Sequence, residues 1–311
     1  GKSFNFTPPN TSAPCGNNPR CCGCTFITNH TCAGPPNGKC NMPHRQPTND
    51  RGYYSLGGSS SGRIRRLRDG RGGFAQLADF SPSLPQPVHG ATLLWSVDGL
   101  VWSALGTIPP GICNGVGEGD FDYLPDGKTL YAILRNSGPK GTLCESFSHD
   151  QGRTWSVARE TNIRPGVSTV SPRLATLPNG LMVISSGRVG LFAWVSQDSA
   201  KSWASYSLAV HHNRHFADQN QRYSEAFVRG SGDTVLSTSY TSMIVLPGRS
   251  DTVLVCYDRL GNGWDPAPGP YGPFTAVYCT RLTFQLNAAA APPAGPPNCN
   301  VRPGIMPDAC A

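Results

Sequence analysis

Short runs of apolar residues alternate with turn-forming sequences along the middle of the chain. Three runs, Thr129–Leu134, Leu181–Ile184 and Thr252–Tyr257, have the length and composition of β-strands. The first two follow Leu124–Gly127 (LPDG) and Leu177–Gly180 (LPNG), whose Asp-Gly and Asn-Gly pairs tolerate the positive φ of tight hairpin turns. The pattern therefore predicts consecutive antiparallel hairpins.

A second motif, Ser-x-Asp followed by Trp, recurs at intervals of about 50 residues. We expect its Asp to accept backbone N–H bonds within a turn and its Trp to pack beneath that turn, so its predicted role is structural. The motif residues are Ser96, Asp98 and Trp102; Ser148, Asp150, Gly152 and Trp155; and Ser196, Asp198 and Trp203.

Together the two motifs define a four-stranded meander of about 50 residues, the size of one blade of a β-propeller. Units of this kind open near Ile64, Phe121, Ser171 and Ala226. The chain has 36 Gly and 29 Pro and is only 14% charged, which favours short strands and turns over long helices. We predict an all-β protein with the propeller at residues 57–286. A disulfide-rich irregular segment (1–56) precedes it, and an Ala/Pro-rich tail (287–311) follows.

The twelve cysteines and three sequons indicate an oxidising compartment. The sequons are at Asn5, Asn10 and Asn29, and N-glycosylation occurs in the secretory pathway. We therefore predict a secreted, extracellular glycoprotein. The expected disulfide cysteines outside the N-terminal cluster are Cys113 with Cys144, Cys256 with Cys279, and Cys299 with Cys310.

Neither a metal site nor a cofactor is predicted. Cys21-Cys22-Gly-Cys24 lacks the paired CxxC spacing of zinc sites, and His211–His215 has no matching Cys or carboxylate pair nearby in sequence. No run of 18 apolar residues occurs, so no membrane span is predicted either.

The chain carries a net charge of +7, and most of its 26 basic residues are Arg. A planar guanidinium matches carboxylates and sulfates, which suits an acidic glycan, although a general compositional bias toward Arg gives the same count. The densest cluster, at residues 63–71, lacks interleaved aromatic residues, so no nucleic-acid partner is expected.

The Ser-x-Asp…Trp motifs resemble the Asp-boxes (BNR repeats) of the sialidase, or neuraminidase, superfamily. Three further stretches resemble the blade openings and the late strand pair of that family, and the resemblance covers roughly residues 57 to 286. They are Glu118–Arg135, Ser171–Arg188 and Tyr240–Asp258. The resemblance implies a six-bladed β-propeller.

The resemblance also implies a site. In the family, arginines bind the substrate carboxylate, a Tyr made nucleophilic by a Glu attacks the anomeric carbon, and an Asp is the acid/base. Matched by motif, Tyr240 is the nucleophile, Glu118 or else Glu225 the activating carboxylate, and Arg135 and Arg188 bind substrate. Each also has a structural alternative: a rim arginine, a packed strand tyrosine, or a turn-capping or calcium-binding carboxylate.

Two features depart from the family. Its Phe/Tyr-Arg-Ile-Pro motif and the acid/base Asp that follows are absent, and Gly62–Arg65 is an echo without the Pro. Six blades need roughly 300 residues, more than the 57–286 segment holds. The N-terminal segment, a longer parent protein, or a neighbouring subunit through self-assembly could each complete the ring.

Two functions follow from these observations. The first is a glycan-binding or structural propeller in an extracellular assembly, favoured by the missing motifs, the sequons and the tail. The second is an exo-sialidase or related glycoside hydrolase with a Tyr nucleophile and an arginine clamp. Glycans, including acidic sugars, are the expected partners of both.

Overall fold

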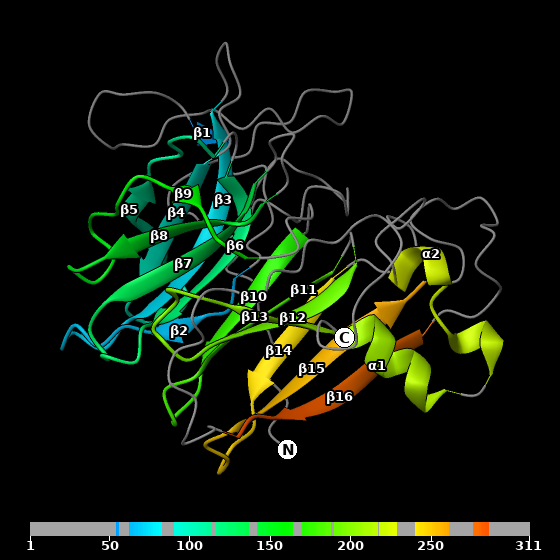
Figure 1. Cartoon of the computed structure of the whole chain (residues 1–311). Helices are drawn as coiled ribbons and strands as arrows, with labels where there is room; N and C mark the ends of the chain where they lie inside the picture. The colour runs from blue at the N-terminus through cyan, green and yellow to red at the C-terminus, as the bar shows by residue number, and fades with distance from the viewer. Residues whose placement is uncertain are drawn as a thin grey trace, which may run out of the picture.

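The computed structural model describes residues 54–55, 62–82, 90–113, 116–136, 142–163, 170–187, 190–216, 218–228, 240–260 and 276–285. Four consecutive antiparallel sheets make up most of this part of the chain (Figure 1). The predicted tail and all but two residues of the predicted N-terminal segment lie outside it. So do Asn5, Asn10, Asn29, Arg188, Cys299 and Cys310.

In the second, third and fourth sheets the strands pair in chain order. The first holds β1 (Tyr54–Ser55), β2 (Arg65–Arg66), β3 (Phe74–Pro82), β4 (Gly90–Ser96) and β5 (Ser103–Ile108). In this first sheet β1 and β2 both pair with β3. The second holds β6 (Val116–Tyr123), β7 (Leu130–Asn136), β8 (Cys144–Ser148) and β9 (Arg159–Glu160). The third holds β10 (Val170–Thr176), β11 (Met182–Gly187), β12 (Leu191–Ser196) and β13 (Ala204–Ser207). The fourth holds β14 (Thr241–Val245), β15 (Thr252–Arg259) and β16 (Ala276–Thr283).

The sheets are arranged as the blades of a β-propeller. Strand β6 lies beside β10, and β10 beside β14, so the first strands of successive blades face one another (Figure 1). In the first blade, Arg63 next to β2 donates its backbone N–H to Asp120 of β6. The prediction of a mostly β protein built from antiparallel sheets is confirmed, and the sheets are consistent with a propeller. Two of the described sheets have four strands, the first has five and the fourth three.

Ala226, near which a fourth unit is predicted to open, lies in a helix, and residues 229–239 after it are outside the described ranges. Three short helical elements connect the third and fourth blades: α1 (Leu208–His215), the 3₁₀ helix η2 (Gln219–Gln221) and α2 (Glu225–Val228), which contains Ala226. The first described strand of the fourth blade is β14. None of the helices within the described ranges is long and apolar enough to cross a membrane.

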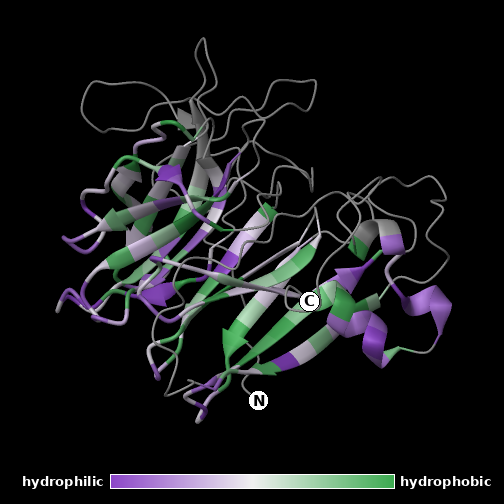
Figure 2. Ribbon diagram, in the orientation of Figure 1, coloured by the Kyte–Doolittle hydropathy of each residue, from purple (hydrophilic) through white to green (hydrophobic). Residues whose placement is uncertain are grey.

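Apolar side chains fill the spaces between neighbouring blades, and apolar segments run along the strands in Figure 2. Three clusters result, because alternate residues of each strand face opposite neighbours. Blades one and two share Leu77, Leu93, Ile108, Phe121 and Leu134. Blades two and three share Tyr131, Ile133, Leu174, Met182 and Trp194. Blades three and four share Val183, Leu191, Met243, Val253 and Leu282.

The three Ser-x-Asp turns have the predicted structural role. In the second blade, Asp150 accepts hydrogen bonds from Ser148 Oγ at 2.9 Å and Thr154 N at 2.9 Å. The indole N–H of Trp155 donates to Gly152 O at 3.1 Å. The first turn has the same arrangement around Asp98 and Trp102. In the third turn Asp198 plays the same part, but the buried indole N–H of Trp203 has no hydrogen-bond partner.

Both predicted disulfides that fall in the described ranges are present. Cys113 is bonded to Cys144, which ties the segment before the second blade to β8. Cys256 and Cys279 are directly opposed residues of β15 and β16, with their Cα atoms 4.0 Å apart.

Candidate functional site

Four strand ends meet where the first strands of blades two, three and four lie side by side. Glu118 is near the start of β6, and Arg135 near the end of its partner β7. Ser171 and Arg173 are on β10, and Tyr240 comes directly before β14. The start of β6 and the start of β10 each contain a register shift, the kind of irregularity that re-aims side chains at strand ends.

Tyr240 and Glu118 are in direct contact although 122 residues separate them in the sequence. The phenolic O–H of Tyr240 donates to Glu118 Oε1 at 3.1 Å. Tyr240 is 36% exposed, so solvent reaches this pair. Of the two carboxylates predicted to act on Tyr240, Glu118 is the one that accepts this bond, whereas Glu225 lies exposed at the start of α2.

The second oxygen of Glu118 is also occupied. Arg135 Nη1 lies 3.2 Å from Glu118 Oε2, and the backbone N–H of Ser171 donates to the same oxygen at 3.1 Å. The carboxylate is therefore fixed by donors from three blades, Tyr240 included. This fixed geometry leaves Oε1 as the oxygen that can exchange a proton with the phenol.

Arg173 is a functional candidate that sequence reasoning missed. Its Nε donates to Thr241 O at 3.2 Å, and its buried Nη1 has no hydrogen-bond partner. Thr241 follows Tyr240 in the chain, so the guanidinium lies close to the phenol–carboxylate pair. Burial lowers the pKa of Arg173, and the charges of Asp120, Glu118 and Tyr240 oppose that effect. Arg173 lies in the stretch Ser171–Arg188 that resembles a sialidase blade opening, but the substrate-binding arginine predicted in that stretch is Arg188.

Two buried guanidinium N–H groups near Tyr240 have no hydrogen-bond partner among the described residues. Besides Arg173 Nη1, the buried Nε of Arg135 has no hydrogen-bond partner. A buried donor without a partner is costly, and a bound carboxylate would satisfy two such donors at once.

Asp120 and Asp122, the next alternate residues of β6 after Glu118, also accept hydrogen bonds from the backbone of β10. Asp120 accepts from Leu174 N at 3.0 Å, and Asp122 accepts from Thr176 N at 2.9 Å. Because β10 is the first strand of its sheet, its outer edge has backbone groups without a strand partner. Carboxylates of the neighbouring blade accept hydrogen bonds from the N–H groups of Leu174 and Thr176 on this edge.

Two arginines of the first blade balance these carboxylates. Arg63 and Arg65 lie 3.6 and 3.5 Å from Asp120 Oδ2, and Arg65 lies 3.0 Å from Asp122. Both arginines also donate to Leu174 O. The Gly62–Arg65 echo of the family motif therefore joins three blades.

Ser171 has a left-handed backbone with φ of 45°, unusual for a residue other than glycine. The other non-glycine residues with positive φ, Gln151, Ser199 and Ala200, are all in Ser-x-Asp turns. At Ser171 the conformation turns the N–H toward Glu118 instead of along the sheet ladder. Local strain of this kind is typical of functional sites.

The histidines of α1 have a packing role in the described structure. His212 is buried, with Nδ1 3.1 Å from Tyr257 Oη and Nε2 2.8 Å from Gln221 O. Burial lowers the pKa of His212, and the hydrogen bond to Gln221 opposes this effect. No group of three or more His, Cys, Asp or Glu side chains in the described ranges could hold a metal ion. Asp258 is half-buried, and its backbone oxygen accepts from Tyr223.

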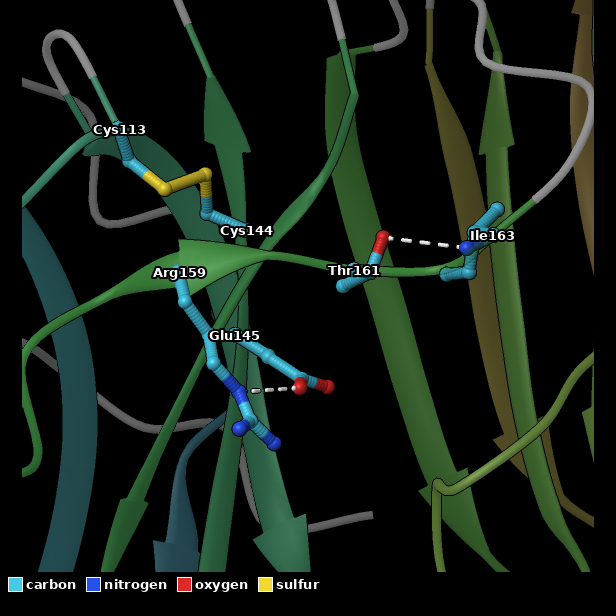
Figure 3. The surroundings of a disulfide bond; sticks show 6 residues. All are labelled: Cys113, Cys144, Glu145, Arg159, Thr161 and Ile163. Carbon is cyan, nitrogen blue, oxygen red and sulfur yellow. Dashed lines mark hydrogen bonds and ion pairs between the residues drawn. A yellow bond between two sulfur atoms is a disulfide. The ribbon is translucent and has the colours of Figure 1, made fainter.

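A second phenol–carboxylate pair lies at the outer part of the second blade. Tyr131 Oη donates to Glu145 Oε2 at 3.0 Å, and Arg159 Nε donates to Glu145 Oε1 at 2.9 Å, beside the Cys113–Cys144 disulfide (Figure 3). Tyr131 is completely buried, so it cannot reach a substrate. Burial raises the pKa of Glu145, and the bonds from Tyr131 and Arg159 oppose the rise.

This environment predicts a pH-dependent effect of Glu145→Gln on stability. The pKa of Glu145 in the folded protein is raised above its usual value of 4.5. The free energy of unfolding of the wild type therefore falls as the pH rises from about 4.5 to beyond the folded-state pKa, because ionisation is less favourable in the folded state. The variant cannot ionise, so its free energy of unfolding relative to wild type should be higher at pH 7 than at pH 4. Urea unfolding at both values measures this, and an unchanged difference contradicts it.

No protein-family model matches the sequence, and no curated protein matches it. Solved structures do resemble it. A protein of unknown function from Dyadobacter fermentans has a TM-score of 0.53 and 18% identity, over 73% of this chain and 54% of that one. The chain thus spans about half the length of that protein, and the likeness is one of fold.

Two glycoside hydrolases show weaker likeness. The α-L-arabinofuranosidase Arb93A of Fusarium graminearum has a TM-score of 0.45 and 17% identity, over 70% of this chain and 61% of that one. The α-L-arabinanase of Penicillium chrysogenum has a TM-score of 0.46 and 14% identity, over 71% and 61%.

Proposed function

We propose that the site around Tyr240 and Glu118 binds an acidic sugar and hydrolyses its glycosidic bond, with Tyr240 as the nucleophile. The hydrogen bond between the Tyr240 phenol and Glu118 Oε1 is the observation that carries this proposal. A nucleophile with a base in hydrogen-bond contact, the base itself fixed by other groups, is the usual arrangement for covalent catalysis. The resemblance of the motifs to Asp-boxes and to sialidase blade openings points to the same chemistry.

The proposed reaction has two steps. The phenolic oxygen of Tyr240 bonds to the anomeric carbon as the bond to the leaving oxygen breaks, and the phenolic proton passes to Glu118 Oε1. The leaving group departs as its oxyanion. Water then attacks the same carbon and releases a proton to solvent, which balances the charge of that oxyanion, while the phenolate of Tyr240 leaves and takes its proton back from Glu118. A phenol suits an anionic substrate, because a carboxylate nucleophile would repel the sugar's own carboxylate.

The substrate carboxylate has two guanidinium partners in this proposal. Arg135 and Arg173 each have a buried N–H group without a hydrogen-bond partner beside Glu118. Guanidinium remains charged at any working pH and forms bidentate bonds with carboxylates. The two arginines would select an acidic sugar over a neutral one and orient its anomeric carbon toward Tyr240.

A second candidate is glycan binding without turnover, in an extracellular assembly. Arg63, the nearest echo of the family's first arginine, is engaged by Asp120 and Leu174 O. In the described residues we assign no side chain as proton donor to the leaving group, and loss of such a donor costs about 10²- to 10⁴-fold in rate. Both candidates include secretion, which the twelve cysteines favour and which removal of N-glycans from the native protein would check.

The test is an assay of the whole chain with a fluorogenic aryl sialoside, alongside calorimetric binding of a soluble sialoside. An aryl leaving group needs little protonation, so this substrate reports on Tyr240 even without a general acid. Turnover supports hydrolysis, and binding without turnover supports the second candidate. If neither occurs, the site does not recognise an acidic sugar and both candidates are wrong.

Arg173→Gln is expected to weaken sialoside binding by about 10- to 100-fold, because it removes a charge-assisted contact to the sugar carboxylate. Arg159→Gln is the matched control, since Arg159 is an exposed arginine on the outermost strand of the second blade. Calorimetry with the acidic sugar and its neutral methyl ester separates the effects. Equal weakening for both ligands would contradict a carboxylate-binding role.

A further inference from the structure

The Ser-x-Asp turn of the first blade exposes three aliphatic side chains. Val97, Leu100 and Val101 are 60%, 64% and 51% exposed. Nine large apolar side chains are exposed in the described part of the chain, and three of them fall within these five consecutive residues. Single exposed apolar residues are normal on protein surfaces, but a contiguous group of them indicates an interaction site.

The turn itself does not require these residues. The equivalent positions hold His149, Arg153 and Thr154 in the second blade and Gln197, Lys201 and Ser202 in the third. All three turns are built by the same bonds from backbone N–H groups to the Asp. The aliphatic character of the first turn is therefore independent of its fold.

The aliphatic side chains project from a fixed backbone. Asp98 Oδ1 accepts from Leu100 N at 2.8 Å and from Val101 N at 3.1 Å. Trp102 is buried beneath and donates to Gly99 O at 3.1 Å. A rigid tip can enter an apolar phase with little further loss of conformational entropy.

Three exposed arginines lie on the loop beside this turn. Phe74 of β3 pairs with Ser96 of β4, so the β2–β3 loop and the β4–β5 turn leave the sheet at the same end. Each exposed arginine stacks on an aromatic ring. The Cζ atom of Arg66 lies 4.8 Å from the ring centroid of Phe74. The corresponding distances are 4.4 Å for Arg68 and Tyr123 and 5.0 Å for Arg71 and Trp95. This stacking holds each guanidinium in place at the surface.

This end is opposite the candidate site. Arg68 N donates to the phenol of Tyr123, the last residue of β6, whereas Glu118 is near the first residue of that strand. Two carboxylates are nearby: Asp69 pairs with Arg71 at 2.7 Å, and Asp98 is used by the turn. Among the described residues neither Arg66 nor Arg68 forms an ion pair, and Arg68 Nη1 contacts the backbone oxygen of Gly127.

We propose that Arg66, Arg68, Arg71, Val97, Leu100 and Val101 form a docking surface for an anionic lipid bilayer, named here the basic–apolar patch. Rigid aliphatic side chains can enter the boundary between head groups and acyl chains, while arginines contact anionic head groups. A sulfated polysaccharide would satisfy the arginines but offers no apolar phase to Val97, Leu100 and Val101. The three aliphatic side chains therefore favour a bilayer.

The test is flotation of the whole chain with vesicles of phosphatidylcholine, with and without phosphatidylserine. We expect binding to the anionic vesicles, reduced by added salt. The triple variant V97Q/L100S/V101S, which gives the turn the polarity of its two counterparts, should bind at least about tenfold more weakly. Val157→Ser and Val277→Ser are controls, since these valines are 59% and 72% exposed outside the patch. Circular dichroism verifies that each variant folds.

Two further measurements decide between partners. R66Q/R68Q should lose the preference for phosphatidylserine, whereas V97Q/L100S/V101S should bind more weakly to vesicles of either composition. No binding of the wild type to anionic vesicles, or equal binding by the triple variant, overturns the proposal. Tight binding to dextran sulfate with none to vesicles assigns the arginines to a soluble polyanion and also overturns it.

Discussion

Replacing Tyr240 with phenylalanine should lower kcat/KM on a fluorogenic aryl sialoside by at least about 10³-fold, because the proposed covalent bond needs the phenolic oxygen. The ring that packs at the site is retained. Sialoside binding should change much less, since Arg135 and Arg173 remain. Initial-rate kinetics together with calorimetry measure the two effects separately.

Tyr206→Phe is the matched control for this experiment. Tyr206 is on β13, and its hydroxyl contacts His211 at 3.0 Å. The control should keep wild-type kinetics. Activity retained in Tyr240→Phe would rule out the nucleophile, and Glu118→Gln, which keeps the shape of the carboxylate but cannot take a proton, should then be examined for a different role.

The largest effect on stability is expected for Asp120→Ala. Asp120 is completely buried, is approached by Arg63 and Arg65, and accepts the backbone N–H of Leu174. Removing the carboxylate takes the acceptor from three backbone N–H groups and the counter-charge from Arg63, while Arg65 keeps its ion pair with Asp122. Breaking a buried ion pair in this way costs about 3–5 kcal/mol of unfolding free energy.

Urea unfolding of Asp120→Ala measures this cost, and Asp120→Asn, which keeps one acceptor oxygen, should lose less. The control is Arg249→Ala, which breaks an exposed ion pair with Asp251 and should cost no more than about 1 kcal/mol. A loss in Asp120→Ala as small as in the control would mean that the contact between β6 and β10 does not depend on this carboxylate.

The features that could be predicted from the sequence are those that depend on residues close together in the chain. The Leu-Pro-Asp-Gly and Ser-x-Asp…Trp motifs depend on residues a few positions apart, so they located the hairpins and the blade period. The same holds for Cys256 and Cys279, which fall on adjacent strands of one blade. Glu118 and Tyr240 were found through a family resemblance, because nothing local in either segment indicates that they meet.

The features that the sequence did not predict depend mostly on contacts between blades. Arg173 has no local feature that separates it from an ordinary strand arginine, and its place beside Glu118 depends on how β10 lies against β6. Ala226 follows a strand-free stretch that no turn motif marks, so the helical connection of α1, η2 and α2 was not predicted. The left-handed backbone of Ser171 was also unpredictable, since it depends on the Glu118 carboxylate across the blade boundary.

The phenol of Tyr240 and the carboxylate of Glu118 belong to different blades, and Ser171 between them belongs to a third. Each sheet keeps its own ladder of backbone bonds even when it is separated from its neighbours. A small displacement of one blade against its neighbours would therefore lengthen the Tyr240–Glu118 contact, and with it the path of the proposed proton transfer, while each ladder stays paired.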